Sequence, residues 1–141
     1  MSDFYKYFKE NMDGLGLPAP ETLFGNAQLA LGNLIIFLSQ IDKFGKTVTI
    51  GELIGAGTKL EQLGVIAALS ASFYAGAVIG SIAIATGRSL AGGTSISDVL
   101  LVATKYGVSR PWLPFTLRRW PGIYNNAIAG RTLYRYQAAT A

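Results

Sequence analysis

Three carboxamide side chains recur at intervals of seven residues in an uncharged part of the sequence: Asn26, Asn33 and Gln40. Each of them directly follows a glycine or a serine. Because seven residues make about two helical turns, the three carboxamides would share one stripe of a helix. Uncharged carboxamides can hydrate an ion without strong selectivity. The spacing therefore predicts pore-lining residues in an assembled channel or, equally, interhelical hydrogen bonds inside one molecule.

Side chains suited to covalent or acid–base catalysis are sparse. The chain contains no Cys and no His, and its eight acidic residues are scattered. It therefore lacks a thiolate nucleophile, the commonest general base and the commonest metal ligands. Gly45-Lys46-Thr47 resembles the end of a phosphate-binding loop, but Gln40 occupies the place of the required first glycine. We predict no catalytic residues, no metal site and no cofactor, and hence no enzyme.

The longest uncharged stretch of the chain covers the 26 residues from Gln62 to Gly87. About 20 helical residues cross the roughly 30 Å hydrocarbon core of a bilayer, so this stretch is long enough to span it. Small residues stand at every fourth position along it: Gly64, Ala68, Ser72, Gly76 and Gly80. Such a row forms a smooth helix face, a glycine zipper, against which another backbone can pack closely. The partner helix would belong to the same molecule or to a second one.

A second apolar helix is predicted from about Pro20 to Phe44, with Gly45 ending it. Between the two apolar helices, Thr49 with Glu52 and Thr58 with Glu61 match the Ser/Thr-x-x-Glu capping box. Half of the chain is hydrophobic and only 14% is charged, against about 25% in typical soluble domains. The mean hydropathy is +0.35. We expect an all-α fold with a helical hairpin of two apolar, membrane-capable helices.

Short amphipathic helices are predicted on both sides of the hairpin. Ser2 can cap a helix over residues 3–12, and Ser95 with Asp98 can cap one over residues 96–105. The chain then divides into three segments. Residues 1–19 form the N-terminal amphipathic helix and connector, residues 20–88 form the hairpin, and residues 89–141 form a short helix and a basic, aromatic C-terminal region.

The C-terminal region combines arginines with aromatic rings. Residues 62–141 carry seven basic residues against one acid, whereas residues 1–61 carry seven acids against five lysines. Trp and Tyr favour the membrane interface, and Arg pairs with phosphate. We predict lipid-interface residues here: Trp112, Arg118, Arg119, Trp120 and Tyr124. The same groups could bind nucleic acid, but no nucleic-acid-binding motif organises them. A solvated tail or a protein-binding surface is the other interpretation.

The absence of a cleavable secretion signal, the apolar helix at 22–41 and the small-residue row from Gly64 to Gly80 together resemble small pore-forming effectors of the bacterial type VI secretion system. The resemblance covers mainly residues 22–88. It implies a toxin that is made in the bacterial cytoplasm, secreted without a cleavable signal, and inserted into the inner membrane of a target cell. It also implies self-association in the bilayer, a secretion-tube or chaperone partner and a cognate immunity protein.

Two other functions fit the same sequence. The chain could be a small integral membrane subunit that scaffolds a larger complex. It could also be a soluble helical interaction protein with the small-residue row buried in its core. We do not expect nucleic acid as a partner in any of these cases.

Overall fold

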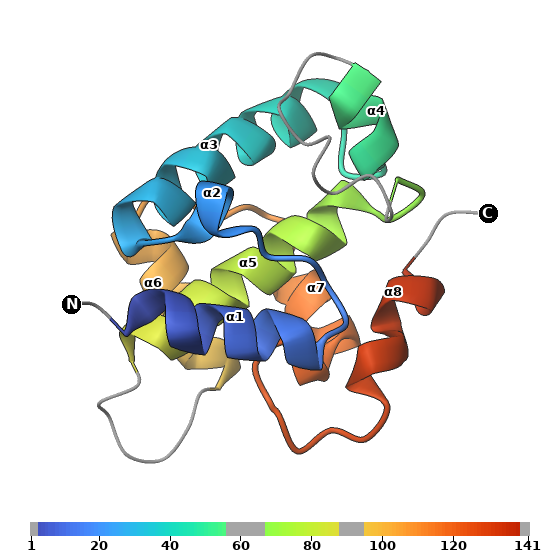
Figure 1. The fold of residues 1–141 in the computed structure, drawn as a ribbon. Helices are drawn as coiled ribbons and strands as arrows, with labels where there is room; N and C mark the ends of the chain where they lie inside the picture. Colours follow the sequence, from blue (N-terminus) through green and yellow to red (C-terminus); the bar gives the residue numbers. More distant parts are fainter. Residues whose placement is uncertain (1–2, 56–66, 88–94, 139–141) are drawn as a thin grey trace.

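The computed structural model describes residues 3–55, 67–87 and 95–138 of the 141-residue chain (Figure 1). Within these ranges the protein is all-α, as predicted, and the only β pairing is an isolated bridge between Thr49 and Ser70. The helices are α1 (Phe4–Gly14), α2 (Glu21–Phe24), α3 (Ala27–Phe44), α4 (Ile50–Gly55), α5 (Ala71–Thr86), α6 (Ile96–Lys105), α7 (Leu113–Arg119), η2 (Pro121–Ile123), η3 (Arg131–Leu133) and α8 (Tyr134–Gln137).

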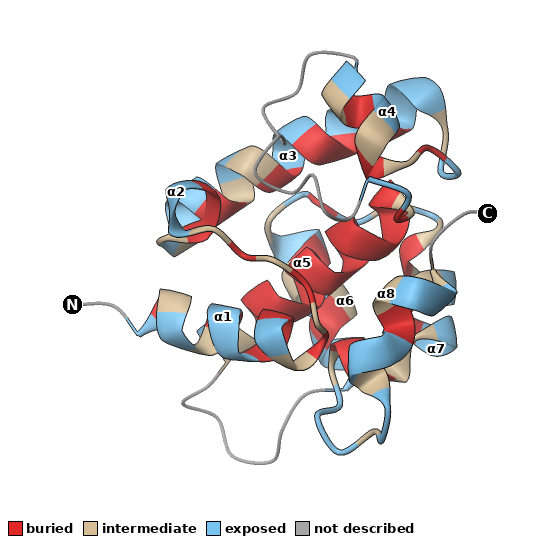
Figure 2. Cartoon of the chain, turned by 45° about the vertical axis from the view of Figure 1, so that its right-hand side comes forward, coloured by how far each residue is buried: buried red, intermediate tan, exposed pale blue. Residues whose placement is uncertain are grey.

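Helix α5 forms the centre of the molecule. It carries no charged residue, and every residue from Ala71 to Ala83 is buried. Helices α1, α3, α6 and α7 and the short η2 all pack against it, and Figure 2 shows it as a buried rod surrounded by half-exposed helices. A helix that is apolar on all sides has to be enclosed, either by protein or by lipid. In this structure the rest of the chain encloses it.

The surrounding helices are amphipathic, which explains how they meet both α5 and water. Helix α1 buries Phe4, Phe8 and Met12, which lie four residues apart on one face. Helix α6 buries Val99 and Ala103. The predicted helices at 3–12 and 96–105 are therefore confirmed, although Ser2 lies outside the described residues and α1 begins after Asp3 without a side-chain cap.

Local capping signals in the sequence predict two of the helix starts correctly. Ser95 and Asp98 form a complete capping box at the start of α6. At the start of α4, the Thr49 amide donates to Glu52 Oε1 at 2.9 Å and the Glu52 amide donates to Thr49 Oγ1 at 3.2 Å. The second predicted box, Thr58 with Glu61, lies outside the described residues.

The prediction of one helix from Pro20 to Phe44 is wrong, because the chain breaks at Gly25 and Asn26. Asn26 is extended, with φ −149° and ψ 168°, and its side chain accepts a hydrogen bond from the Leu29 amide. It is therefore the N-cap of α3, and α2 is a separate turn before it. The C-terminal end is as predicted, since α3 stops at Phe44 and Gly45 follows with φ +104°.

The prediction of one helix through residues 62–87 is also wrong in its first part. Helix α5 begins only at Ala71, where Ser70 accepts a hydrogen bond from the Phe73 amide. Residues 67–70 form a turn and the bridge to Thr49, and residues 62–66 lie outside the described ranges. The carbonyls of Leu69 and Ala67 accept hydrogen bonds from the amides of Ile50 and Gly51 at the start of α4. These carbonyls are thereby engaged outside α5, which favours the later start.

No helix in the described ranges has both the length and the apolar character required to cross a bilayer. The predicted hairpin corresponds to α3 and α5, which pack against each other. Both helices contribute buried side chains to one hydrophobic core, and Figure 1 shows how they are arranged in the fold.

Candidate functional site

The small-residue face of α5 packs against the C-terminal part of the same chain. A Cβ atom added to Gly76 would lie 2.9 Å from Thr116 Cγ2, and one added to Gly80 would overlap with Ile123 Cγ2. Ser72 is buried on the same face, and its hydroxyl donates to the Lys46 carbonyl at 2.7 Å. The close contact predicted for these three residues therefore occurs within one molecule. The partners of Gly76 and Gly80 are α7 and η2, and the partner of Ser72 is the loop after α3.

Of the other two members of the predicted zipper, only Ala68 belongs to the described residues, and it is not on this face. Ala68 lies in the exposed turn before α5, so it does not continue the helical row. Gly64 lies outside the described residues. The four-residue spacing of small residues continues through this turn, but the helix begins only after its N-cap, Ser70.

The three carboxamides do not form one stripe on a single helix. Asn26 caps α3, as described above, and Asn33 Nδ2 donates to the Leu23 carbonyl at 2.8 Å. This bond joins α3 to α2 and corresponds to the intramolecular alternative for Asn33. Gln40 is half-buried near the other end of α3. In this structure Asn26 and Asn33 have local structural roles.

Beside the carboxamides, α3 presents large apolar side chains to solvent. Leu29, Ile35 and Ile36 are 38%, 51% and 50% exposed. Leu29, Gly32 and Ile36 line a shallow groove together with the two asparagines. An isolated exposed leucine is ordinary, but adjacent exposed residues on one helix form a patch. Hydropathy alone marked this segment as apolar and did not reveal which side faces water.

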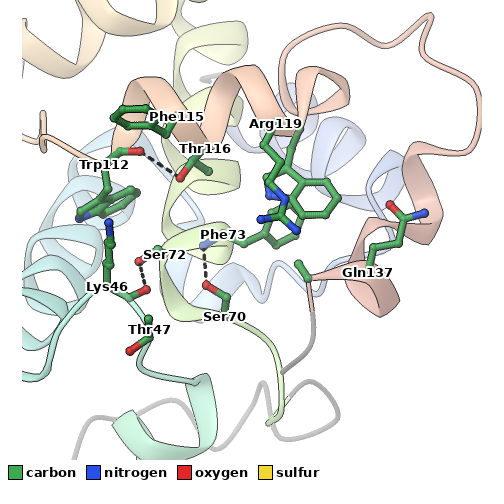
Figure 3. Close-up of a pocket in the computed structure, with 12 residues that line it drawn as sticks. Lys46, Thr47, Ser70, Ser72, Phe73, Trp112, Phe115, Thr116, Arg119 and Gln137 are labelled. Atoms are coloured by element: carbon green, nitrogen blue, oxygen red, sulfur yellow. Dashed lines mark hydrogen bonds between the residues drawn. The ribbon is translucent and has the colours of Figure 1, made fainter. Parts of the chain in front are cut away.

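Three of the predicted lipid-interface residues gather around one pocket of about 390 Å³ (Figure 3). They are Trp112, Arg119 and Trp120. Arg118 is exposed and Tyr124 is half-buried, and neither lines the pocket. The complete lining is Lys46, Thr47, Ser70, Ser72, Phe73, Trp112, Phe115, Thr116, Arg119, Trp120, Gln137 and Ala138.

Four separate parts of the chain build this pocket. The loop after α3 contributes Lys46 and Thr47, the start of α5 contributes Ser70 to Phe73, and α7 with its flanks contributes the tryptophans and Arg119. The end of α8 closes one side, where the Ser70 amide donates to the Ala138 carbonyl at 3.2 Å. The Ser72–Lys46 hydrogen bond also fixes the loop against α5. The walls are therefore attached to the central helix.

The pocket is basic and aromatic. Among the described residues of the lining, Lys46 and Arg119 are charged and none carries a carboxylate. Within the described ranges neither cation forms an ion pair with an acidic residue. Arg119 Cζ lies 5.0 Å from the centre of the Trp120 ring, which in turn contacts Phe73 edge-on at 5.4 Å. Such a surface suits an anion that carries an apolar group.

Sequence analysis missed Lys46 as a member of this site. Its neighbours Gly45 and Thr47 drew attention only as a failed phosphate-binding loop. No local pattern predicts that Lys46 and Arg119 line the same pocket, because 73 positions separate the two residues in the chain. The tertiary contact between the loop and α7 brings them to one pocket.

A buried polar network, also missed, ties α1 and α5 to the C-terminal part. Asn11 Nδ2 donates to Ser81 Oγ and to the Ile123 carbonyl, both at 2.9 Å. Arg131 donates to Asn11 Oδ1 at 2.8 Å and to the Gly122 carbonyl at 2.9 Å. Burial lowers the pKa of the Arg131 guanidinium. Ser81 is thus one of the few polar contacts between α5 and the surrounding helices.

Tyr74 of α5 is enclosed by the rings of Phe24 and Phe37. Its hydroxyl donates to the Pro18 carbonyl at 2.7 Å. Burial raises the pKa of this hydroxyl. The residue therefore anchors the connector between α1 and α2 to the central helix.

In the part of the chain that the structure describes, no three acidic side chains are grouped to hold a metal ion. Comparisons with protein-family models, with curated proteins and with solved structures find no match to this chain. The resemblance to type VI pore-forming effectors accordingly stays a prediction from residues 22–88.

Proposed function

We propose that this protein is a membrane-inserting, pore-forming antibacterial toxin that dissipates ion gradients across the inner membrane of a target cell. One observation carries the proposal. The uncharged helix α5 lies at the centre of the molecule, and amphipathic helices separate it from water. A protein that must travel through water and then enter lipid needs its apolar segment covered in this way.

The covering contacts are of a kind that lipid can replace. Helix α5 contributes Phe73, Val78, Ile79 and Ile82 to the core, all buried. Removing a large apolar side chain from water contributes about 1.5–3 kcal/mol, whether protein or hydrocarbon receives it. Exchange of one apolar environment for the other is therefore nearly neutral for the apolar side chains of α5. The energetic cost of opening falls on the polar bonds of Ser72, Tyr74 and Ser81 and on the apolar faces of the covering helices.

Membrane entry would require a longer helix than the one in the compact form. The 16 residues of α5 extend about 24 Å, against a hydrocarbon core of roughly 30 Å. The uncharged run in the sequence covers 26 residues, which is sufficient if the turn at 67–70 becomes helical. In the proposed membrane form the bridge between Thr49 and Ser70 opens and the helix grows towards its N-terminus.

In that form, the small-residue face would be free for new partners. Thr116 and Ile123 leave Gly76 and Gly80 when α5 departs from α7 and η2, and a second helix can take their place. Helix α3, whose Ile35 and Ile36 are already exposed, is the natural companion of α5 in a hairpin. Its carboxamides would then face a small water-filled path.

The proposal is tested with purified protein and liposomes that carry a potassium diffusion potential and a potential-sensitive dye. We expect detergent-free protein to collapse the potential, and we expect expression directed to the periplasm to be toxic while cytoplasmic expression is tolerated. A detergent-free protein that leaves the potential intact would contradict the proposal. A protein that is obtained only in detergent and is harmless would instead identify an integral membrane subunit.

A second function, a soluble helical interaction protein, is favoured by a different observation. Gly76 and Gly80 already have close partners within the molecule, so their small size is explained without a membrane. The exposed patch of α3 would then be a protein-binding surface. This function predicts a detergent-free monomer that does not bind liposomes in a flotation experiment.

A further inference from the structure

We propose that the pocket between the start of α5 and α7 binds the phosphate group of an anionic phospholipid, with phosphatidylglycerol as the representative ligand. The inference deepens the proposed function: a lipid as the ligand depends on membrane action, whereas binding of a phosphate ester by the pocket does not. The occupant is defined by three features of the pocket, namely its charge, its apolar walls and its position on α5.

Charge selects an anion. Lys46 and Arg119 line the same pocket, and none of the described residues of the lining carries a carboxylate. Hydrogen bonds with a charged partner are about twice as strong as neutral ones, and within the described ranges neither cation is paired with an acidic residue. The hydroxyl of Thr47 and the amide of Gln137 add neutral donors at the rim. A phosphate diester, with one charge and several acceptor oxygens, matches this set.

Apolar walls select an anion that has a hydrophobic part. The rings of Phe73, Trp112, Phe115 and Trp120 make up much of the lining (Figure 3). Phe115 is 69% exposed, so one wall continues from the pocket onto the open surface of α7. Inorganic phosphate would leave these rings in water, whereas a glycerol backbone and the first carbons of acyl chains would cover them. A volume of about 390 Å³ lies within the range for sites that take small organic ligands.

The position of the pocket connects binding to the central helix. Ser70 caps α5, and Phe73 in its first turn forms part of the wall. A headgroup held there would bring the N-terminal end of α5 to the membrane surface. This is the end at which α5 must lengthen to span a bilayer. The pocket would thus select the surface on which the compact form opens.

The chain provides its own probe of this site. It contains two tryptophans, and both line the pocket, so intrinsic fluorescence reports on it directly. The protein is titrated with dihexanoyl phosphatidylglycerol below its micelle concentration, and separately with dihexanoyl phosphatidylcholine, glycerol 3-phosphate and inorganic phosphate. We expect saturable binding of the phosphatidylglycerol, with affinity about tenfold or more above that of the other three.

Charge-removing variants identify the residues. Lys46→Gln with Arg119→Gln should weaken binding of dihexanoyl phosphatidylglycerol about tenfold or more. The matched control is Lys43→Gln with Lys105→Gln, which removes two exposed cations outside the pocket and should bind as the wild type does. Equal weakening in both pairs would overturn the site, since it would indicate diffuse attraction to a basic surface.

The titrations with soluble ligands distinguish a failure of this inference from a failure of the proposed function. If glycerol 3-phosphate binds as tightly as the phosphatidylglycerol, the lipid part of the inference is wrong, because the apolar walls then contribute nothing. If phosphatidylcholine binds equally well, selection by net negative charge is wrong. Loss of liposome leakage with intact phosphatidylglycerol binding would overturn the pore and leave the site standing.

Discussion

Gly76 and Gly80 determine how closely α5 approaches α7 and η2. The space beside each is filled by a side chain of the C-terminal part, Thr116 for Gly76 and Ile123 for both. A buried core has little room for an added carbon, and its neighbours have to shift to receive one. Gly32 on α3 is the opposite case, since an added Cβ there meets nothing within 4 Å.

Replacement of Gly80 by alanine should therefore destabilise the compact form. The added methyl overlaps with Ile123 Cγ2, and overpacking of this kind costs about 1–3 kcal/mol, against which higher helix propensity recovers about 1 kcal/mol. We expect a lower midpoint of urea unfolding, followed by circular dichroism. The matched control Gly32→Ala should raise the midpoint, because only the propensity gain of about 0.5–1 kcal/mol applies. A stabilised Gly80→Ala variant would refute the packing described for α5.

The sequence indicated which small residues pack closely, but it did not indicate which residues they contact. The four-residue spacing of Ser72, Gly76 and Gly80 is a local pattern, and it correctly indicated a closely packed face. The contacts with Thr116 and Ile123 span some forty residues of chain, and nothing in the local pattern encodes them. The hydrogen bonds of Asn11 and Arg131 were not predicted either, because a polar residue is by default expected to face water.

The helices around α5 cover it and separate it from water, and α6 is the simplest example. Val99 is fully buried, whereas Leu101 on the same helix is 69% exposed. In the proposed function the stability of this cover limits opening. Weakening the cover should favour the membrane form without altering α5 itself.

Val99→Ala is the corresponding prediction. Loss of two buried methyl groups should lower the free energy of unfolding by about 1–3 kcal/mol and increase the rate of liposome leakage. The matched control Leu101→Ala removes more carbon from an exposed position and should change neither quantity. Leakage that is unchanged, or slower, in a demonstrably destabilised Val99→Ala variant would contradict the idea that the cover limits entry.

Helix ends were predicted correctly where a side chain makes a local cap. They were predicted wrongly where the apolar pattern was assumed to continue across a capping residue. The boxes at Thr49 and Ser95 are short-range hydrogen bonds, so the sequence reveals them. Asn26 and Ser70 are also caps, but each lies inside a long apolar run that favours an uninterrupted helix. Hydropathy indicates that a segment avoids water, but it does not distinguish burial in protein from burial in lipid. For that reason residues 62–87 were predicted to form one membrane helix.

The whole molecule brings together segments that the sequence left apart. The predicted divisions at residues 1–19, 20–88 and 89–141 describe the chain order, yet helices from all three pack on α5. The pocket likewise combines the loop after α3 with α7 and α8. Only the tertiary arrangement brings Lys46, Arg119 and the two tryptophans together in one pocket.

The central claim, that α5 leaves its cover to enter a membrane, can be tested with one engineered disulfide. A Cβ at position 76 lies 3.8 Å from the Thr116 Cβ, which is about the mean separation in natural disulfides. Thr116→Cys also removes Cγ2, the atom closest to the added Cβ. The chain has no cysteine of its own, so Gly76→Cys with Thr116→Cys gives a single bond between α5 and α7.

Liposome leakage is measured for the oxidised double variant, for the same protein after reduction, and for each single variant under both conditions. We expect the oxidised double variant to stay folded and to leave the membrane potential intact, and we expect reduction to restore leakage. The leakage caused by each single variant should not depend on oxidation. Leakage by the oxidised double variant at the rate of its reduced form would contradict the account, because α5 would then be dispensable as a mobile element.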